Sequence, residues 1–311
     1  MFISPFDLAK ATSAAAIAAQ PFVGTGDKNG ADGACTDALR SVLTETNFKG
    51  KIIIGEGEKD EAPGLFSGEI LGTADNEPSD IAVDPLEGTT FCANGQANSF
   101  SVMAVTEPGS MFDPGPAFYM DKIAVGPEAK GAIDPNAPYT EQLKALAAAL
   151  GKPASELCIY MLDRPRNQAI LDAIRSLGAK ASLYSGGDVL GGLMALMDDK
   201  PVDALMGIGG SPEGLISAAA CKALGGDFFG SLDPQSDQEA SKLAGAGLGT
   251  EWLGLDQLIS GEQVAFAITG ITTGLLLDAP VYDGRSWATD TLMISGPDAT
   301  LHRLQTYFSN S

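Results

Sequence analysis

The sequence is poor in histidine and has no paired cysteines, and these two shortages narrow its possible chemistry. His302 is the only histidine in 311 residues, so a histidine general base is not expected and a multi-histidine metal site is excluded. The four cysteines, Cys35, Cys92, Cys158 and Cys221, lie far apart and form no C-x-x-C pair. Scattered thiols are typical of a reducing compartment, so we expect a cytoplasmic protein with mostly buried cysteines.

Positive charge and long apolar runs are also scarce. The chain has 19 Lys and Arg against 40 Asp and Glu, a formal net charge of -21, which repels nucleic acid and anionic membranes. No stretch approaches the roughly 18 consecutive apolar residues of a membrane span. We therefore expect no nucleic-acid or membrane partner. An anionic substrate would need local cations or a metal to reverse the field.

The first half of the sequence predicts an α+β domain over residues 1–150. Helices are expected at 7–20 and 31–46, and a strand at 51–54, where a β-branched run ends at glycine. Further strands are expected in "DIAVD", "SFSVMAVTE" and "AFYMDKIAVG". Few helices separate these strands, so the sheet should be antiparallel or mixed.

The second half, residues 151–311, alternates strand and helix patterns and predicts a Rossmann-like α/β domain with a parallel sheet. The boundary follows a helix that we expect to be capped by Thr140 and ended by Gly151. "AGAGLGTEW" is expected to be a surface loop, and residues 285–311 a hairpin that could belong to either domain.

Acidic residues stand where the predicted elements begin or end, each near glycine or proline. Glu56 and Asp84 follow strands, Glu87 comes three residues after Asp84, and Asp32 and Glu213 lie at predicted helix starts. Divalent cations such as Mg²⁺ and Mn²⁺ prefer carboxylate oxygens in rigid sites. The pattern therefore predicts a metal site.

The stretch "DIAVDPLEGTT" adds the remaining parts of a phosphate site. Pro85 stiffens the backbone between the two acids, and Gly88 and Thr89 begin a turn whose N–H groups can face a phosphate. The Thr89 hydroxyl can orient a water. Metal, phosphate cradle and hydroxyl together indicate phosphate ester hydrolysis.

Plainer interpretations remain open for each motif. A D-x-x-E turn is often a solvated cap, and "EGEKDEAP" is often an exposed acidic loop. Within that run Glu56 is favoured as a ligand over its neighbours Glu58, Asp60 and Glu61. "GIGGSPEG" resembles a dinucleotide loop, but Pro212 replaces the third glycine, and Ser211 with Pro212 makes a good helix start in any case.

Two arginines form the complementary cationic set. Arg164 and Arg166 in "DRPR" follow a predicted strand, and arginine binds phosphate through two parallel hydrogen bonds. They suit a second phosphate of the substrate, although a surface salt-bridge loop with Asp163 is the alternative. Lys28 and Lys130 are weaker candidates.

Together these motifs resemble the class II fructose-1,6-bisphosphatases, within the lithium-sensitive phosphatase superfamily that includes the inositol monophosphatases. The motifs that carry the resemblance, in family order, are "GDKNGADGA", "IIIGEGEKDEAP", "DIAVDPLEGTT", "YMDKIAVGP", "DRPR", "GGDV", "GIGGSPEG" and "AITGITTG". "DP-x-[DE]-GT" marks only the superfamily, whereas the long "GEGE-x-DEAP" and "GIGG-x-PEG" strings are far more specific.

The resemblance implies a layered αβαβα sugar-phosphatase sandwich with an active site between two domains, and hydrolysis of the 1-phosphate of fructose 1,6-bisphosphate in gluconeogenesis. It also implies Mn²⁺ or Mg²⁺ as cofactor and a homodimer or homotetramer. The implied metal ligands are Asp32, Glu56, Asp84, Glu87 and Glu213, with Thr89, Asp84 and Glu213 as catalytic residues. The implied substrate contacts are Glu87, Gly88, Thr89, Tyr119, Arg164, Arg166, Asp188 and Gly210, with Lys28 added from its position.

The sequence departs from the family pattern at two points near the implied substrate contacts. Gly186 stands where the family usually has aspartate, and Asn167 where histidine is common. The lost carboxylate would relax recognition of the sugar, so sedoheptulose 1,7-bisphosphate, a Calvin-cycle substrate of similar proteins, is a second expected substrate. An inositol-phosphate or other sugar monophosphatase, and a non-catalytic cation- or metabolite-binding protein, remain alternatives.

Overall fold

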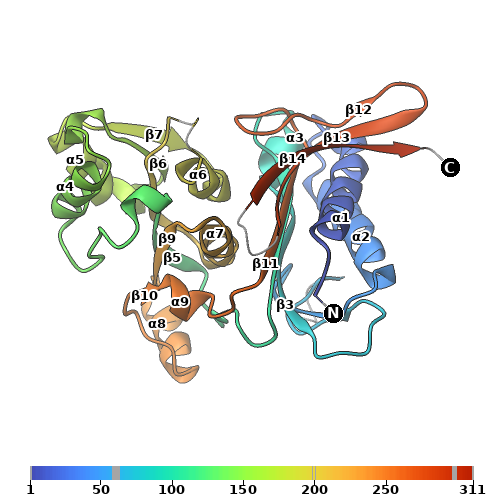
Figure 1. Ribbon diagram of the computed structural model, residues 1–311, viewed down its shortest axis with the longest axis horizontal. Coiled ribbons are helices and arrows are strands. Elements are labelled where there is room, and N and C mark those ends of the chain that lie inside the picture. The colour runs from blue at the N-terminus through green and yellow to red at the C-terminus, as the bar shows by residue number, and fades with distance from the viewer. Residues whose placement is uncertain (1, 58–63, 198, 200, 296–299, 310–311) are drawn as a thin grey trace. The chain divides into compact units, whose positions relative to one another are not determined.

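The computed structural model describes residues 2–57, 64–197, 199, 201–295 and 300–309, so Glu58, Asp60 and Glu61 lie outside the described residues. The chain forms two compact units, Met1–Met111 with Gly261–Ser311, and Phe112–Ser260 (Figure 1). The sequence placed the division near residue 150. The structure divides the chain earlier, and the C-terminal segment returns to the first unit.

The first unit is built on a mixed sheet, as the sequence predicted. Its strand order is β12-β13-β11-β4-β3-β1-β2, with β14 also paired to β13, and only β1 and β3 run parallel. The strands are β1 Gly50–Ile54, β2 Ile70–Leu71, β3 Ser79–Glu87, β4 Phe100–Thr106, β11 Val264–Gly270, β12 Val281–Tyr282, β13 Ser286–Ser295 and β14 Thr300–Ser309. Because β13 pairs with β11, the C-terminal hairpin belongs to this sheet.

Two long helices, α1 Pro5–Ala18 and α2 Lys28–Glu45, lie along one face of this sheet (Figure 1). Ser4 caps α1 by accepting a hydrogen bond from the Phe6 amide, and Asp27 caps α2 by accepting from the Gly30 amide. The sequence placed the start of α2 at residue 31. Asp32 therefore lies inside the helix and not at its mouth.

The second unit contains a six-stranded sheet in the order β10-β9-β5-β8-β6-β7. Its strands are β5 Tyr119–Val125, β6 Cys158–Leu162, β7 Lys180–Tyr184, β8 Ala204–Gly210, β9 Asp227–Leu232 and β10 Leu253–Gly254. Only β7, β6 and β8 are parallel, and β5 runs antiparallel to both β8 and β9. The prediction of a parallel sheet is thus wrong for half of this sheet, and β5 does not join the first sheet.

The helices of the second unit cover both faces of its sheet (Figure 1). Helices α4 Tyr139–Ala149 and α5 Gln168–Ser176 pack on one face, and α6 Asp188–Ala195 and α7 Ser211–Leu224 on the other. The described residues also form the short helices α3 Thr89–Ala93, α8 Asp237–Gly245 and α9 Leu255–Leu258, and single 3-10 turns at 20–22, 127–129, 154–156 and 165–167. The first unit has two layers and the second three, so the predicted α/β layering is confirmed.

Two predicted caps are displaced. Helix α4 begins at Tyr139 after Pro138, so Thr140 lies within its first turn and its side chain does not cap the helix. Helix α7 begins at Ser211 after Gly210, one residue earlier than predicted. Gly151 does follow the end of α4, with a left-handed φ of 64°.

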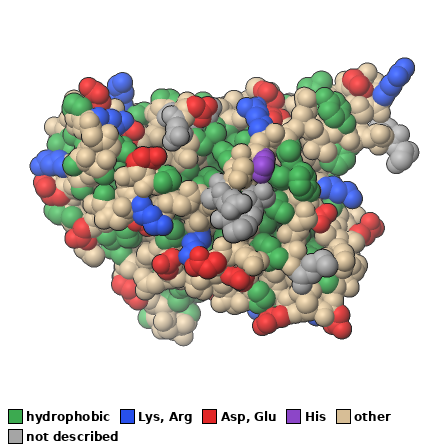
Figure 2. Space-filling model, in the orientation of Figure 1, with side chains coloured by type: hydrophobic (Ala, Val, Ile, Leu, Met, Phe, Trp, Pro, Cys, Tyr) green, Lys and Arg blue, Asp and Glu red, His purple; other side chains and the backbone are tan. Residues whose placement is uncertain are grey.

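The surface agrees with the charge of the sequence. On the face drawn in Figure 2, acidic side chains are scattered among apolar and polar ones, and basic side chains form no continuous patch. No helix within the described residues is both long and apolar enough to cross a membrane.

Candidate active site

Three predicted metal ligands of the first unit lie near enough to one another to interact. Glu56 follows β1, Asp84 lies on the neighbouring parallel strand β3, and Asp32 approaches from α2; Glu56 shares a hydrogen bond with Asp32. Burial, and then the charges of Asp84 and Asp32, raise the pKa of Glu56 to about 8, and burial raises the pKa of Asp32. The mutual repulsion that raises the Glu56 pKa is the arrangement a bound cation would relieve.

The backbone around Glu56 is held by a buried acid that the sequence did not single out. The Glu56 amide donates to the Leu65 carbonyl at 3.0 Å, and the Leu65 amide donates to Glu69 at 2.6 Å. Glu69 is buried and is paired with Arg40. Gly55 has to be glycine, since a Cβ there would lie 2.0 Å from the Leu65 carbonyl oxygen.

Asp84 and Glu87 are brought together by a break in β3. The register with β4 shifts between these two residues, and their carboxylate oxygens lie within 4.8 Å of each other. The Asp84 side chain is oriented by the backbone, because its Oδ1 accepts a hydrogen bond from the Leu86 amide at 3.0 Å. The spacing that suggested two aimed carboxylates therefore does bring them together.

The turn after Glu87 has a left-handed backbone at Gly88. Gly88 adopts φ 76° and ψ 42° in front of α3, and a side chain there would meet the Phe91 ring at 2.8 Å. The Thr89 hydroxyl donates to the Leu86 carbonyl at 3.2 Å. Lys28 is adjacent to this turn, where its Nζ donates to the Thr90 hydroxyl at 2.8 Å.

In the second unit, the two arginines follow β6. The Arg166 guanidinium lies over the Tyr119 ring, 4.3 Å from its centre, and its Nε donates to the Ile208 carbonyl at 3.1 Å. Arg164 is exposed and donates to the carbonyls of Ser185 and Asp163. Both guanidinium groups are thus oriented by the backbone, and the Tyr119 stack ties β5 to the arginine loop.

Asn167, the residue in place of histidine, has a structural role that the sequence did not reveal. It is almost fully buried. Its Nδ2 donates to the Leu162 carbonyl at 3.0 Å, and its Oδ1 accepts the Ile208 amide at 2.7 Å. Asn167 therefore joins the arginine loop to the end of β8.

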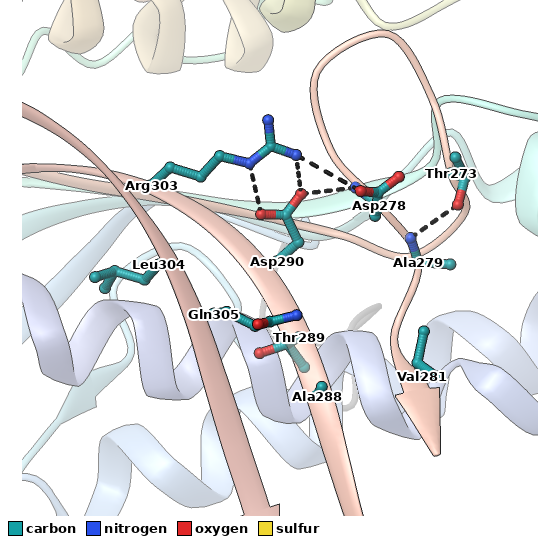
Figure 3. Close-up of a pocket in the computed structure, with 10 residues that line it drawn as sticks. All are labelled: Thr273, Asp278, Ala279, Val281, Ala288, Thr289, Asp290, Arg303, Leu304 and Gln305. Carbon is teal, nitrogen blue, oxygen red and sulfur yellow. Dashed lines mark hydrogen bonds and ion pairs between the residues drawn. The ribbon is translucent and has the colours of Figure 1, made fainter. Parts of the chain in front are cut away.

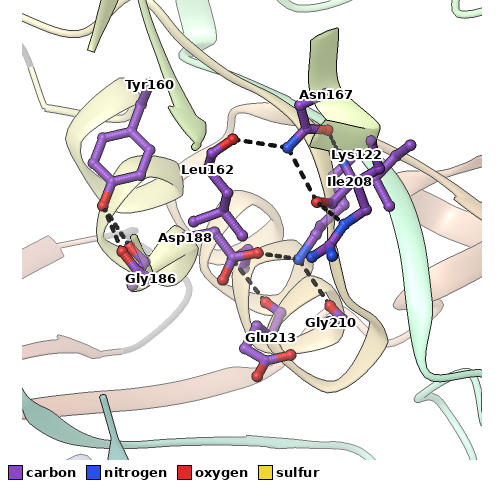
Figure 4. A network of polar contacts seen from close by, with 12 residues as sticks. Lys122, Tyr160, Leu162, Asn167, Gly186, Asp188, Ile208, Gly210 and Glu213 are labelled. Atoms are coloured by element: carbon purple, nitrogen blue, oxygen red, sulfur yellow. Dashed lines mark hydrogen bonds and ion pairs between the residues drawn. The ribbon is translucent and has the colours of Figure 1, made fainter. Parts of the chain in front are cut away.

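The remaining predicted residues of this unit surround a buried lysine (Figure 4). Asp188 begins α6 and pairs with Lys122 of β5, whose Nζ also donates to the Gly210 carbonyl at 2.8 Å. Glu213 lies in the first turn of α7, and its carboxylate lies beside Gly210, where a Cβ would be 1.8 Å from its Oε2. The sequence did not single out Lys122, because no local pattern indicates that a lysine in this strand is buried.

A separate pocket of about 560 Å³ lies in the first unit and contains none of the predicted site residues (Figure 3). Arg303 of β14 makes two bonds to Asp290 there, at 2.9 and 2.5 Å, and lies 3.7 Å from Asp278. Its one guanidinium is matched by two carboxylates, so this pocket is not suited to an anion.

Comparison with known proteins identifies the family. A family model described as bacterial fructose-1,6-bisphosphatase, glpX-encoded, matches residues 4–308. The chain belongs to this family. It is 42% identical over 313 residues to the fructose-1,6-bisphosphatase 1 class 2 of Escherichia coli strain K12, covering 96% of this chain and 93% of that protein. The fructose-1,6-bisphosphatase class 2 of Shigella flexneri matches to the same extent.

Membership confirms the resemblance seen in the sequence and makes the chain a fructose-1,6-bisphosphatase of class II, a phosphoric monoester hydrolase. The acidic cluster of Asp32, Glu56 and Asp84 has the donor set of a divalent metal site. The individual roles of the site residues and the identity of the ion stay predictions.

Proposed function

We propose that this bisphosphatase removes the 1-phosphate of fructose 1,6-bisphosphate, giving fructose 6-phosphate and phosphate, at an acidic site that requires Mn²⁺ or Mg²⁺. The observation that carries the proposal is the hydrogen bond between Glu56 and Asp32 beside the charge of Asp84. Burial and then the charges of Asp84 and Asp32 raise the pKa of Glu56 to about 8. A divalent cation relieves this repulsion, and carboxylate oxygen is the donor that both ions prefer. Membership of the family supports the same conclusion.

The ligands we propose are Asp32, Glu56, Asp84, Glu87 and Glu213, the last on the resemblance alone. When bound, the cation supplies Lewis-acid stabilisation of phosphate oxygens and activation of water. The residues of the chain position the attacking water and the phosphate. Thr89 is held by the Leu86 carbonyl, with its oxygen able to accept from and orient a water, and Gly88 sets the turn that receives the phosphate.

The two arginines bind the second phosphate of the substrate. Arg166 is fixed by the Tyr119 ring and the Ile208 carbonyl, so its guanidinium is oriented before substrate arrives. Arg164 keeps an exposed guanidinium. Binding the distant phosphate fixes the orientation of the reacting one, which lowers the entropic cost of reaction. A monophosphatase would have no use for this pair.

Asp188 and Gly210 contact the sugar, and the absence of a carboxylate at Gly186 widens the substrate range. We therefore propose sedoheptulose 1,7-bisphosphate as a second substrate, with use in the Calvin cycle as well as in gluconeogenesis. We also propose a cytoplasmic homodimer or homotetramer, on the resemblance and on the scattered cysteines.

Phosphate release tests the proposal. The chain is treated with a chelator, restored with Mn²⁺ or Mg²⁺, and given fructose 1,6-bisphosphate, fructose 1-phosphate and inositol 1-phosphate. We expect metal-dependent release from the bisphosphate and far less from either monophosphate. Equal release from all three would favour a general monophosphatase, and no release with any metal would favour a binding protein.

A matched pair of variants tests the acidic site. Glu213→Gln is expected to reduce turnover by about 100-fold or more, as loss of transition-state electrostatics does in other enzymes. Binding of the distant phosphate should change little. Glu141→Gln, an exposed acid of the same unit, is the control and should keep full turnover. Equal losses in both variants would indicate general destabilisation.

A further inference from the structure

Lys122 is a buried ammonium at the junction of three segments of the second unit. It is 0% exposed on β5. Its Nζ donates to Oδ2 of Asp188 at the start of α6 and to the carbonyl of Gly210 in front of α7 (Figure 4). Its stem packs on α7 at Gly214, where a Cβ would lie 3.2 Å from the lysine Cδ.

The position is electrostatically unfavourable for a lysine in a purely structural role. Helices α6 and α7 both begin beside its Nζ, and helix N-termini repel cations. A buried ion pair contributes little net stability, and apolar replacements are often as stable. The ammonium is kept in place by Asp188, which is itself only 3% exposed.

The backbone on either side of the Lys122–Asp188 pair is constrained. Gly187 in front of it is left-handed, with φ 78°, and its carbonyl accepts the Tyr160 hydroxyl at 2.9 Å. A Cβ on Gly209 would lie 2.1 Å from Asp188 Oδ2. The absence of a side chain at this position of β8 therefore leaves room for the Lys122–Asp188 ion pair. Among the described residues, Oδ1 of Asp188 accepts no hydrogen bond.

We propose that Lys122 is a positioning residue for substrate recognition. By holding Oδ2 of Asp188 it presents Oδ1 to a hydroxyl of the sugar, and by holding the Gly210 carbonyl it fixes the neighbouring backbone contact. This inference rests on the proposed function, because it takes Asp188 and Gly210 as sugar contacts. Lys122 itself touches neither substrate nor metal.

Kinetics of Lys122→Met, Asp188→Asn and the double variant test the proposal, with fructose 1,6-bisphosphate and p-nitrophenyl phosphate as substrates. Lys122→Met should raise KM for the bisphosphate about tenfold or more, with a much smaller fall in kcat, because a charge-assisted contact in binding is lost. Its loss on p-nitrophenyl phosphate, which has no sugar, should be far smaller. The double variant should resemble Asp188→Asn alone, since Lys122 acts through Asp188.

Lys152→Met is the matched control. Lys152 pairs with Asp203 at 2.5 Å in the same unit, away from the sugar contacts, so this variant should lose stability without a change in KM. The double variant leaves no unpaired buried charge, and it keeps the test valid if Lys122→Met does not fold. A wild-type KM in Lys122→Met, additive effects in the double variant, or equal losses on both substrates would overturn the proposal. Wild-type chain that releases no phosphate from the bisphosphate would instead overturn the proposed function.

Discussion

At the scale of single residues, the second unit contains a partly buried carboxyl, Asp121, with a raised pKa. Asp121 lies on β5, two residues after Tyr119, and accepts the Tyr139 hydroxyl at 3.1 Å. Burial raises its pKa to about 6, the Tyr139 bond opposes this, and the charge of Asp233 adds to it. The folded chain therefore holds this proton more tightly than the unfolded chain does.

This pKa predicts a loss of stability with rising pH. The contribution of Asp121 is fully present below its ordinary pKa of 3.8 and falls until about pH 6. Asp121→Asn should therefore stabilise the chain at pH 7.5 by on the order of 1–2 kcal/mol and change little at pH 4. Urea unfolding of both chains at the two pH values measures this. An equal difference at both values would show that the pKa is not the cause.

At the scale of elements, the short junction between β3 and α3 depends on one glycine. Gly88→Ala places a Cβ in the left-handed region and 2.8 Å from the Phe91 ring, so it should cost about 1–2 kcal/mol and also reduce turnover by shifting Thr89. Gly109→Ala is the control, because Gly109 has φ 67° with open space around it. Thermal unfolding and phosphate release compare the two variants. Similar effects of both on turnover would exclude a specific role for the turn.

Local patterns predicted most elements, because periodicity and turn residues act over a few neighbours. The strand expected at 51–54 formed as β1. The strand expected in "DIAVD" also formed, but it continues to Glu87, so Asp84 lies within β3 and not at its end. Sheet membership was harder. β5 joined the second sheet because Tyr119 pairs with Gly210, a partner far along the chain that no local pattern specifies.

The same limit explains which site residues the sequence missed. Lys122 follows Asp121 in a predicted strand, and a lysine there is normally solvent-exposed. It is buried by elements far along the chain: α6, the end of β8 and α7. Helix α8 and strand β9 were missed because their sequence is short and polar or glycine-containing. The acids near strand ends could be singled out because a strand end fixes its side chains wherever the sheet lies, and their role as metal ligands stays a prediction.

At the scale of the whole molecule, 40 acidic residues oppose 19 basic ones, and the acidic cluster concentrates that repulsion. Ionisation of Glu56, whose pKa is about 8 without metal, destabilises the metal-free chain as pH rises toward and through 8, because the folded state binds the proton more tightly. Cation binding removes this penalty and displaces the proton. Mn²⁺ should therefore raise Tm more at pH 8.5 than at pH 6.

Thermal unfolding with Mn²⁺ or with chelator at both pH values measures this difference. Asp84→Asn should lose most of the rise in Tm, while Asp75→Asn, a fully exposed acid of the same unit, should keep it. Equal rises in Tm at the two pH values would show that the metal stabilises the chain independently of the titration of Glu56.

The path of the chain through its two units also sets an order of events during synthesis. The second unit is one continuous segment, Phe112–Ser260, and can fold as soon as it leaves the ribosome. The first unit cannot complete its sheet at that stage, because β4 pairs with β11 and β11 pairs with β13. Strands β11 and β13 are both translated after the second unit. Helix α1, translated first, packs against β11 and β13, which are translated last. Until these strands are made, the edge of β4 that pairs with β11 has unpaired backbone N–H and C=O groups.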